Sequence, residues 1–334
     1  MTEFRPSDDS VLLTGADGFL GANLSRALVA RGFRVRALLQ PGREVGTLDG
    51  VPVEIVRADL ADAAGLPSLL AGVGAVVHTV ASTAVWPSRD PSQRALNHDL
   101  ALALAKAARE AGVRRFVHVG TANSFAAGTK DAPGDERGPY DAGRFGLDYQ
   151  DSKRAAQDSL LALNRDGFDL VVANPTFMFG PFDSKPGSGE LLMQVARGRV
   201  PGSAPGGRCF ADVRDVASGI VAALERGRPG QCYILGGENL SYAEAFALIA
   251  RVCGTRPPRL RLPAPAVLAF GAFGSAFAAL TGRAPKVSLP MARISCEGQY
   301  YSSAKAVAEL GYAIRPVAEG IAAARDWFRA RGML

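Results

Sequence analysis

The chain has 334 residues, of which 48% are hydrophobic and 21% charged, and its formal net charge is +6 at pH 7. This composition is typical of a soluble globular protein and excludes a disordered chain or a collagen-like repeat. The length predicts roughly two domains. No block of five or six like charges occurs, so we expect a solvated basic surface and no nucleic-acid partner.

The first half of the chain alternates short apolar runs with segments of helical periodicity. The runs predict strands at 11–14, 33–39, 53–56, 75–80, 115–119 and 169–174, with one more at 233–237. Helices are predicted at 20–30, 66–71, 93–111 and 147–164. Strands that alternate with helices, and that are nearly continuous in Val, Leu and Ile, predict an α/β fold with a doubly wound parallel sheet.

The pattern changes after Pro175, where turn-rich stretches such as 180–190 separate short helices. One of these helices is predicted to begin at Ser241 as its N-cap and to end at Gly254 as its C-cap. We therefore expect a Rossmann domain at 1–177, completed by segments within 205–237. The remainder, 178–334, is expected to form mainly a smaller α/β substrate-binding domain.

Residues 264–281 form an uncharged apolar run that is about long enough to span a bilayer. The run contains Pro265, Gly271 and Gly274, and many of its apolar residues are alanines. We interpret it as a buried helix of the second domain and expect no membrane partner. A helix lying on a membrane surface is the alternative.

The cysteine and histidine positions bear on compartment and metal binding. Four cysteines occur, no two with CxxC spacing, and the three histidines do not group with them, so we expect no metal site. The polar N-terminus does not have the pattern of a secretory signal, and we expect a cytoplasmic protein with reduced thiols. His78 and His118 lie in predicted strands, and we interpret them as hydrogen-bonded core residues.

The segment between the first predicted strand and the first predicted helix reads TGADGFLG (14–21). Glycines at such a junction permit a tight turn and a close approach of the backbone to a pyrophosphate. The free N–H groups at the start of the helix attract the phosphate charge. We predict that a dinucleotide cofactor is held here by Gly15, Gly18, Phe19, Leu20 and Gly21.

The residues expected at the adenosine end of that cofactor follow the second and third predicted strands. Gln40 stands where NAD-binding proteins usually carry a carboxylate, and Arg36 and Arg43 are near enough in sequence to meet a 2′-phosphate. Asp59, followed by Leu60, can accept a hydrogen bond from the adenine amino group or cap a helix. The pattern favours NADP, with NAD as the alternative.

Tyr149 and Lys153 are four residues apart on a predicted helix, so both side chains face the same side. A phenol has an ordinary pKa of about 10, and a nearby cation lowers it towards the range useful for proton transfer. The same lysine can also hold the cofactor ribose. Tyr301 and Lys305 repeat this spacing far into the C-terminal domain, and we interpret that pair as structural.

A hydroxyl group beyond the fifth predicted strand would complete a catalytic set, because ligands of doubly wound sheets collect at the carboxyl ends of the strands. Thr121 and Ser124 are both candidates for stabilising negative charge on a substrate oxygen. Contacts with a small-molecule substrate are expected in the same region, from Trp86, Asn123, Ser124 and Phe177.

Together these residues resemble the extended short-chain dehydrogenase/reductase superfamily, also called the NAD-dependent epimerase/dehydratase superfamily, over essentially the whole chain. The branch they resemble is the dihydroflavonol-4-reductase-like one, which includes the hopanoid-associated sugar epimerases. The matching motifs are GADGFLG, Asp59-Leu60, VVHTVAS with Trp86, Asn97, REAGVRRFVHV, Tyr149 with Lys153, NPTFMFGP and RGRPGQCYILGGENLSY.

The resemblance implies further site residues. It places Thr121 where the family usually has a catalytic serine, and it puts a second group of residues around the cofactor, namely Thr79, Val80, Ala81, Pro175 and Thr176. Family members often dimerise through two helices, for which 93–111 and 147–164 are the candidates. The run Thr121-Ala122-Asn123 differs from the Thr-Asp-Glu of sugar dehydratases, which argues against dehydration.

The co-occurrence of the glycine motif, Thr121, Tyr149 and Lys153 predicts an NAD(P)-dependent oxidoreductase that interconverts a ketone and an alcohol. In this hypothesis Tyr149 supplies the proton, Lys153 lowers its pKa, and Thr121 polarises the oxygen. The first alternative is a sugar epimerase that retains its NAD. The second is a cofactor-binding regulatory protein with vestigial activity.

Overall fold

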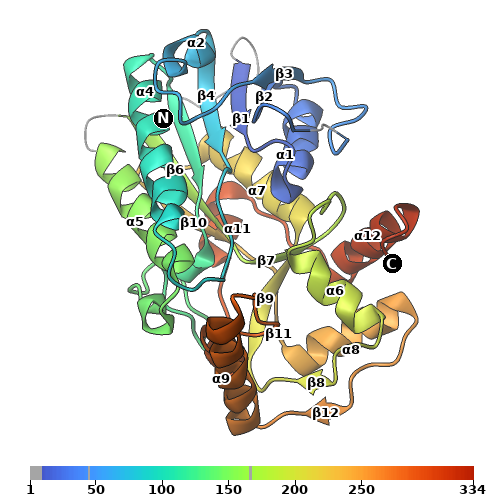
Figure 1. Ribbon diagram of the computed structural model, residues 1–334. Coiled ribbons are helices and arrows are strands. Elements are labelled where there is room, and N and C mark those ends of the chain that lie inside the picture. The colour runs from blue at the N-terminus through green and yellow to red at the C-terminus, as the bar shows by residue number, and fades with distance from the viewer. Residues whose placement is uncertain (1–9, 44–45, 165–167) are drawn as a thin grey trace.

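The computed structural model describes residues 10–43, 46–164 and 168–334, so most of the polar N-terminal segment lies outside the described residues. Seven parallel strands form its main sheet, in the order β10-β6-β5-β4-β1-β2-β3 (Figure 1). The strands are β1 (Ser10–Thr14), β2 (Arg34–Leu39), β3 (Glu54–Arg57), β4 (Val73–His78), β5 (Arg115–Val119), β6 (Asp169–Pro175) and β10 (Cys232–Leu235).

Helices cover both faces of this sheet because successive side chains of each strand point to opposite sides. On β1, Val11 and Leu13 join a core with α1, α7 and α11, whereas Leu12 joins a core with α2, α4 and α5. The arrangement confirms the predicted doubly wound Rossmann fold. The helices are α1 (Phe19–Ala30), α2 (Leu66–Leu70), α3 (Ser92–Arg94), a π-helical turn (Ala95–Asp99), α4 (Leu100–Glu110), α5 (Asp148–Leu163), α7 (Val213–Arg226) and α11 (Ala304–Leu310).

The strand order reverses direction at β1, which pairs with β2 on one side and with β4 on the other. The connections from these strands run to opposite sides, so a crevice opens beyond the carboxyl ends of β1 and β4. Thr14 and His78, the last residues of the two strands, are paired in register. Any ligand of this sheet is expected at that crevice.

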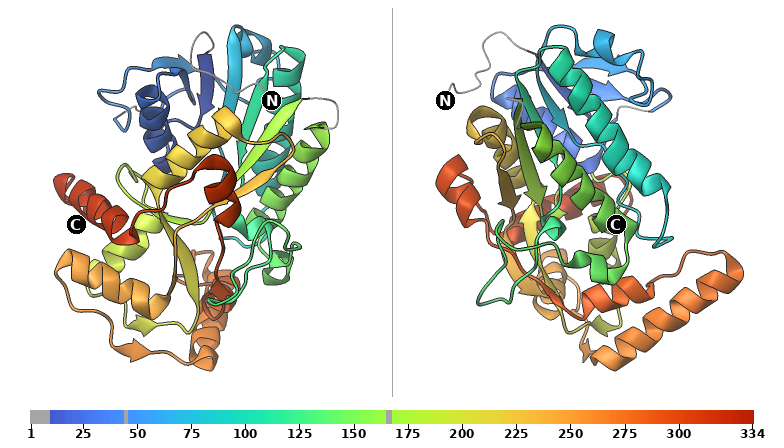
Figure 2. Two further views of the ribbon diagram at one scale, coloured as in Figure 1. Left: turned by 180° about the vertical axis from the view of Figure 1, so that it is seen from behind. Right: turned by 90° about the vertical axis from the view of Figure 1, so that its left-hand side faces the viewer.

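A second lobe is built around a smaller sheet of β7 (Phe177–Phe179), β9 (Gly207–Asp212), β11 (Glu238–Ser241) and β13 (Gly298–Gln299) (Figure 2). Its core is closed by α6 (Ser188–Ala196), α8 (Tyr242–Cys253) and α12 (Val317–Ala330). The predicted caps of α8 are confirmed, since Ser241 and Glu244 form a capping box and Gly254 has a φ of +73°. A short pair, β8 (Gly202–Ser203) and β12 (Leu260–Arg261), lies at the edge of this lobe.

The interpretation of 264–281 as a buried helix is wrong. The segment forms α9 (Ala264–Thr281), but only Val267, Gly271 and Ala278 are buried. The contacts of that side are with α10 (Leu289–Ser295) and the loop before it, where a Cβ on Gly271 would come within 2.4 Å of the Ala292 Cβ. One short helix cannot cover a longer helix that is apolar all round, so the remaining faces of α9 are exposed.

α9 is also the one helix of the described residues that is long and apolar enough to cross a membrane by length and composition, with 17% of it buried. The views in Figure 2 show it at the lower end of the molecule, reaching beyond the second lobe.

His78 and His118 lie fully buried on β4 and β5, with their ring centroids 5.7 Å apart. The hydrogen-bonded interpretation is right for Nδ1 of His78, which is 2.9 Å from Thr14 Oγ1. It is wrong for His118, whose two ring nitrogens have no hydrogen-bond partner among the described residues. Burial lowers the pKa of His78 to about 3, and it lowers the pKa of His118 well below its ordinary value.

We predict that acid weakens the fold through these two rings. The unfolded imidazoles bind protons below pH 6.5 and the folded ones do not, so the free energy of unfolding falls as the pH falls from 6.5 towards 3. His78 should contribute a loss of about 2 kcal/mol between pH 7 and pH 5, and His118 a further loss of the same sign. Urea unfolding at the two pH values measures this loss.

The variant His118→Phe separates this effect from the titration of other groups. Phenylalanine keeps the ring in the apolar core and cannot take up a proton. Its stability should decline less between the two pH values than that of the unmodified chain. An unchanged decline would show that His118 does not drive it.

Candidate functional site

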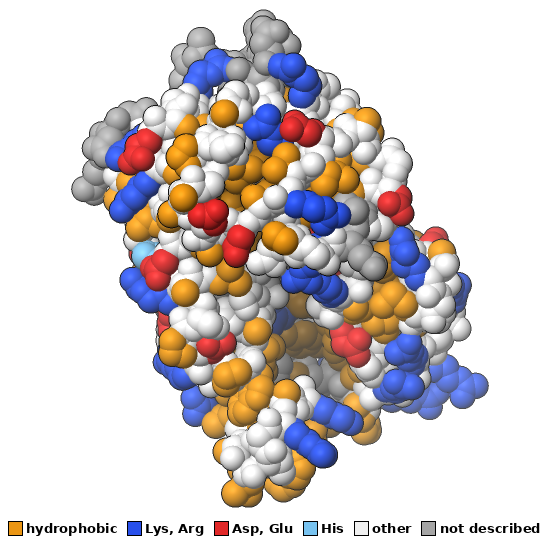
Figure 3. Space-filling view, turned by 45° about the horizontal axis from the view of Figure 1, so that its top comes forward, with side chains coloured by type: hydrophobic (Ala, Val, Ile, Leu, Met, Phe, Trp, Pro, Cys, Tyr) orange, Lys and Arg blue, Asp and Glu red, His pale blue; other side chains and the backbone are white. Residues whose placement is uncertain are grey.

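A cleft of about 1670 Å³ lies at the crevice beyond the carboxyl ends of the sheet strands. It is lined by the loops after β1, β2, β3, β4 and β5, by α5, and by β7, β9 and α10 of the second lobe. Figure 3 shows the surface hollowed between the two lobes, with hydrophobic side chains in its depth. Among the described residues, no group of three or more His, Cys, Asp or Glu lies close enough together to hold a metal ion.

The glycine-rich loop after β1 forms one end of the cleft. Gly15 adopts a φ of +69°, and a Cβ on Gly21 would lie 2.0 Å from the Gly15 carbonyl oxygen, so neither position admits a side chain without movement. The first turn of α1 carries no acidic residue and no side-chain cap. Its N–H groups therefore face the cleft as an anion-binding site, which fits the pyrophosphate of a dinucleotide. The predicted residues Gly15, Gly18, Phe19, Leu20 and Gly21 all line the cleft.

The adenosine end is lined by most of the residues that the sequence predicts. Gln40, Asp59 and Leu60 border the cleft, and so does Arg43. Arg36 does not, and its prediction as a cofactor contact is wrong. The guanidinium of Arg36 donates to the carbonyl oxygens of two residues at the end of α2 and pairs with Glu54 on the neighbouring strand, which turns it away from the cleft.

The loop after β4, with Thr79, Val80 and Ala81, also borders the cleft. The Oγ1 of Thr79 donates to the carbonyl oxygen of Thr14 at 2.7 Å, which fixes the start of this loop to the end of β1. Asn97, in the π-helical turn, holds the other end of the loop. Its Oδ1 accepts from Ser82 N at 2.7 Å, and its Nδ2 donates to Ser82 O and to Ser152 Oγ, both at 3.0 Å.

Thr121, Tyr149 and Lys153 come together in the middle of the cleft. α5 carries Tyr149 and Lys153 one turn apart, and Thr121 follows β5, with a side-chain hydrogen bond to the Tyr149 phenol. The Lys153 ammonium donates to the Val119 carbonyl oxygen at 2.6 Å, and its burial lowers the pKa to about 8. Thr121 and Tyr149 of the predicted catalytic set are therefore in contact, and Lys153 lines the same cleft one helical turn from Tyr149.

The cation that acts on the Tyr149 phenol is not the one expected. Burial raises the pKa of Tyr149, and the hydrogen bond from Thr121 and the charge of Arg208 oppose that rise. Arg208 extends from β9 of the second lobe, and its Nε donates to the Tyr242 hydroxyl at 2.8 Å. The assignment of the electrostatic role to Lys153 is thus corrected to Arg208. The sequence feature that could have pointed to Arg208 is a single arginine within a mostly apolar strand, GRCFAD (207–212).

The structure distinguishes the two hydroxyl candidates. Ser124 is fully buried, its Oγ has no partner among the described residues, and it does not line the cleft, so its prediction as a substrate contact is wrong. Thr121 does line it. Position 120 has no room for a side chain, because Asn174 packs against it. A Cβ on Gly120 would lie 2.6 Å from the Asn174 Nδ2, which donates to the Thr121 carbonyl oxygen.

The far end of the cleft is lined by Asn123 and Phe177, as expected, whereas Trp86 does not border it. The interpretation of Tyr301 as a purely structural residue is wrong. It lines the cleft, and its hydroxyl lies 3.3 Å from Asn123 Oδ1. Lys305 of the same decoy pair donates instead to the Gln231 side chain and to a β10 carbonyl oxygen. The rest of this wall is largely apolar and includes Val85, Met178 and Met291. Pro175 and Thr176, which are predicted to lie at the cofactor, also line the cleft.

Comparison with known proteins agrees with the family that the sequence motifs indicate. The model of the NAD dependent epimerase/dehydratase family matches residues 11–236. A putative dihydroflavonol 4-reductase from Synechocystis is 30% identical over 332 residues, covering 97% of this chain and 96% of the relative. Sterol demethylase protein B from Methylococcus capsulatus is 31% identical over 333 residues, covering 97% and 100%. The crystal structure of gox2253 superposes with a TM-score of 0.87 at 31% identity and covers 98% of this chain and 100% of its own.

We predict that Gly21→Ala strongly weakens the binding of NAD(P)H. The added Cβ would lie 2.0 Å from the Gly15 carbonyl oxygen and must push the loop out of the shape that admits a diphosphate. Gly46→Ala is the matched control, since Gly46 lines the same cleft and its Cβ would meet nothing closer than 3.8 Å. Fluorescence titration should give a dissociation constant raised about a hundredfold or more in Gly21→Ala only. Equal affinities in the two variants would refute the assignment.

Proposed function

The chain belongs to the NAD dependent epimerase/dehydratase family, an extended branch of the short-chain dehydrogenases/reductases, and we propose that it reduces a ketone on an apolar substrate to an alcohol. The observation that carries this proposal is the hydrogen-bonded pair of Thr121 and Tyr149 in a cleft that begins at a dinucleotide-binding loop. This complete set gives no support to a regulatory protein with vestigial activity.

Each side chain has a defined task in this reaction. The reduced nicotinamide, when bound, supplies a hydride to the carbonyl carbon. Tyr149 gives its phenolic proton to the carbonyl oxygen, and the resulting phenolate is stabilised by the hydrogen bond from Thr121 and by the charge of Arg208. Lys153, one turn further along α5, has the task of holding the ribose in this proposal, and the proton lost by Tyr149 is restored from solvent.

The apolar wall at the far end of the cleft supports the substrate class. Val85, Phe177, Met178 and Met291 border that end and favour a hydrophobic body next to the carbonyl group. A relative over essentially the whole length is named a sterol demethylase protein, and a sterol is a molecule of this type. The proposed substrate is therefore a ketone carried on a lipid-like skeleton.

An epimerase that retains its NAD and acts on a sugar nucleotide is the second candidate. Arg208 favours it, because a buried guanidinium in the cleft is suited to pair with a diphosphate. In that reaction the hydride returns to the same sugar carbon, so no net oxidation of the cofactor accompanies turnover.

The test is turnover of NADPH with a panel of sterol ketones, long-chain oxo compounds, small polar ketones and sugar nucleotides. We expect net oxidation with the apolar ketones, and Tyr149→Phe should lower kcat by about 10²–10⁴-fold while NADPH still binds. Tyr300→Phe is the control, since this tyrosine does not line the cleft. Near-normal turnover in Tyr149→Phe would contradict the proton-donor role. Sugar epimerisation without NADPH consumption would select the second candidate.

We further propose that NADPH is preferred over NADH. Gln40 and Arg43 border the adenosine end, and neither brings a carboxylate to repel a 2′-phosphate. Arg43→Ala should therefore weaken NADPH binding about tenfold and leave NADH binding unchanged, because only the first cofactor loses a charge-assisted hydrogen bond. The control is Arg36→Ala, whose guanidinium is held by α2 outside the cleft. Parallel losses for both cofactors would rule out a phosphate contact.

A further inference from the structure

α9 presents a strongly apolar face that no described part of the chain covers. Phe270, Phe273, Phe277 and Leu280 recur at spacings of three and four residues, so they lie along one side of the helix. Phe273 is 70% exposed and Leu280 is 88% exposed. A soluble domain rarely exposes large side chains in a continuous row, and such a row marks a surface that meets another phase or molecule.

The charges around this row have one sign. Between Glu244 and Glu297 the chain has no acidic residue, whereas it has seven Lys and Arg, all of them exposed. Arg259 and Arg261 come just before α9, and Arg283 and Lys286 come just after it. None of the seven forms an ion pair within the part of the chain that the structure describes. The surroundings of the apolar row are thus positively charged and not neutralised.

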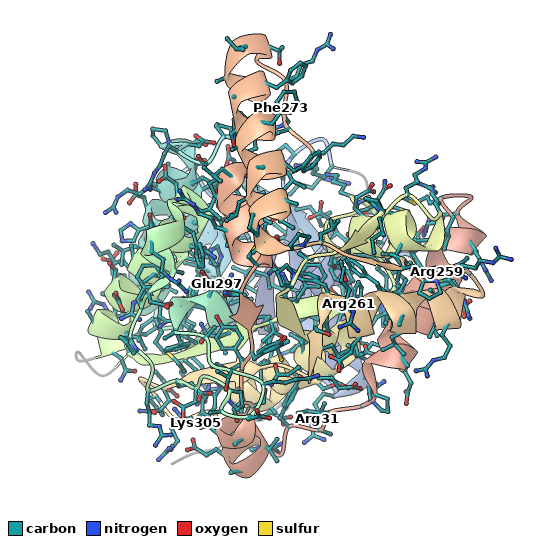
Figure 4. All side chains as sticks on the ribbon, turned by 90° about the horizontal axis from the view of Figure 1, so that it is seen from below. Arg31, Arg259, Arg261, Phe273, Glu297 and Lys305 are labelled. Carbon is teal, nitrogen blue, oxygen red and sulfur yellow. The ribbon has the colours of Figure 1, made fainter. Side chains whose placement is uncertain are left out.

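The elements that carry these residues lie together in space. In Figure 1, α9 and β12 both occupy the lower end of the molecule, and Figure 2 shows α9 reaching out beyond the second lobe. Figure 4, seen from below, shows Phe273 on the part of α9 that extends past the body. Arg259 and Arg261, the second of which belongs to β12, lie on the body to one side of α9. Apolar side chains and basic groups therefore share one end of the protein.

We propose that this end of the protein docks on the surface of a membrane rich in anionic phospholipids, with α9 lying in the plane of the interface. The phenylalanines and Leu280 enter the boundary of the acyl chains, and the basic residues at both ends of the helix pair with headgroup phosphates. This partner matches both the apolar row and the unpaired positive charge.

The loop that follows α9 argues against a helix that crosses the bilayer. The helix has 18 residues and is roughly 27 Å long, close to the hydrocarbon thickness. However, the chain turns back at Gly282, and a Cβ on Gly274 would come within 2.5 Å of the Val287 carbonyl oxygen, so the returning loop packs against the helix. Insertion from the tip would carry Arg283 and Lys286 into the hydrocarbon, which is costly.

A second copy of the chain fits this surface less well. The heptad-like spacing of the row would suit helix pairing, but a symmetric pair would bring the basic groups of both copies together with no acidic residue from 245–296 to offset them. Anionic headgroups supply the missing charge.

Docking in this orientation brings the membrane near the cleft. α10 packs against α9 through Ala292, and Met291 of the same helix lines the apolar end of the cleft. A substrate that partitions into the bilayer would thus have a short route to the site. This consequence depends on the proposed function, but the docking itself does not.

The experiment is sedimentation of the purified full-length chain with vesicles, without substrate. Vesicles of phosphatidylglycerol and phosphatidylcholine in equal parts should bind the protein, and pure phosphatidylcholine should bind it at least about tenfold more weakly. Raising the ionic strength to about 1 M, where the screening length is about 3 Å, should reduce binding to the anionic vesicles. Absence of binding to either vesicle would overturn the proposal.

Two pairs of variants separate the apolar and the ionic contributions. The double variant Phe273→Ser with Phe277→Ser should weaken vesicle binding by about tenfold or more. The matched control, Ile55→Ser with Ile314→Ser, removes exposed apolar side chains elsewhere and should leave binding unchanged. Arg283→Glu with Lys286→Glu changes only exposed residues and should abolish the preference for anionic vesicles.

Unchanged binding in the phenylalanine variant would show that α9 is not the docking element. Light scattering of the unmodified chain addresses the remaining possibility. A dimer that the phenylalanine variant converts to a monomer, together with no vesicle binding, would assign the surface to a second copy instead. NADPH affinity and circular dichroism verify that each variant is folded. Ketone reduction by an unmodified chain that binds neither kind of vesicle would overturn the docking proposal and leave the proposed function intact.

Discussion

The cleft depends on a single close approach of backbone to backbone. The Cα of Gly21 sits so near the Gly15 carbonyl oxygen that α1 can begin directly over the end of β1. This contact brings the first turn of α1 and its unpaired N–H groups to the crevice where the strand order reverses. Thr79 then fastens the next loop to the same point through the Thr14 carbonyl oxygen. The position of the glycine-rich loop and of the cleft beyond it follows from that packing.

Within the described residues, the two cations that line the cleft interior, Lys153 and Arg208, form no ion pair with a carboxylate. Lys153 is bonded to a backbone carbonyl oxygen, and the groups that act most strongly on Arg208 are tyrosines. Buried cations are costly to keep unless a ligand or a transition state supplies the opposite charge. In the proposed function, such partners are the phosphates of the cofactor and the substrate oxygen that gains charge during reduction. The charge of Arg208 also favours the phenolate form of Tyr149, so this phenol can still release its proton although burial raises its pKa.

The second lobe supplies part of the cleft wall and one of the charged groups in the cleft. β7 follows β6 after a single residue, so the cleft wall at Phe177 and Met178 is continuous with the Rossmann sheet. β9, paired with β7, brings Arg208 to the Tyr149 phenol, and α10 joins the cleft wall to the exposed helix α9. The residues around Tyr149, the wall of the cleft and the apolar surface of α9 are therefore connected through directly packed elements.

The sequence by itself determined the sheet, its helices and the cofactor loop, because hydrophobic periodicity and glycine spacing are local properties that the backbone obeys directly. It also identified Thr121, Tyr149 and Lys153, since residues one turn apart on a helix, or just beyond a strand, have predictable positions. Only the tertiary structure decided between Thr121 and Ser124, turned Arg36 away from the cleft and brought Arg208 and Tyr301 into it. It alone left α9 exposed. These outcomes depend on contacts between segments far apart in the chain, and no local pattern encodes which partner a side chain will meet.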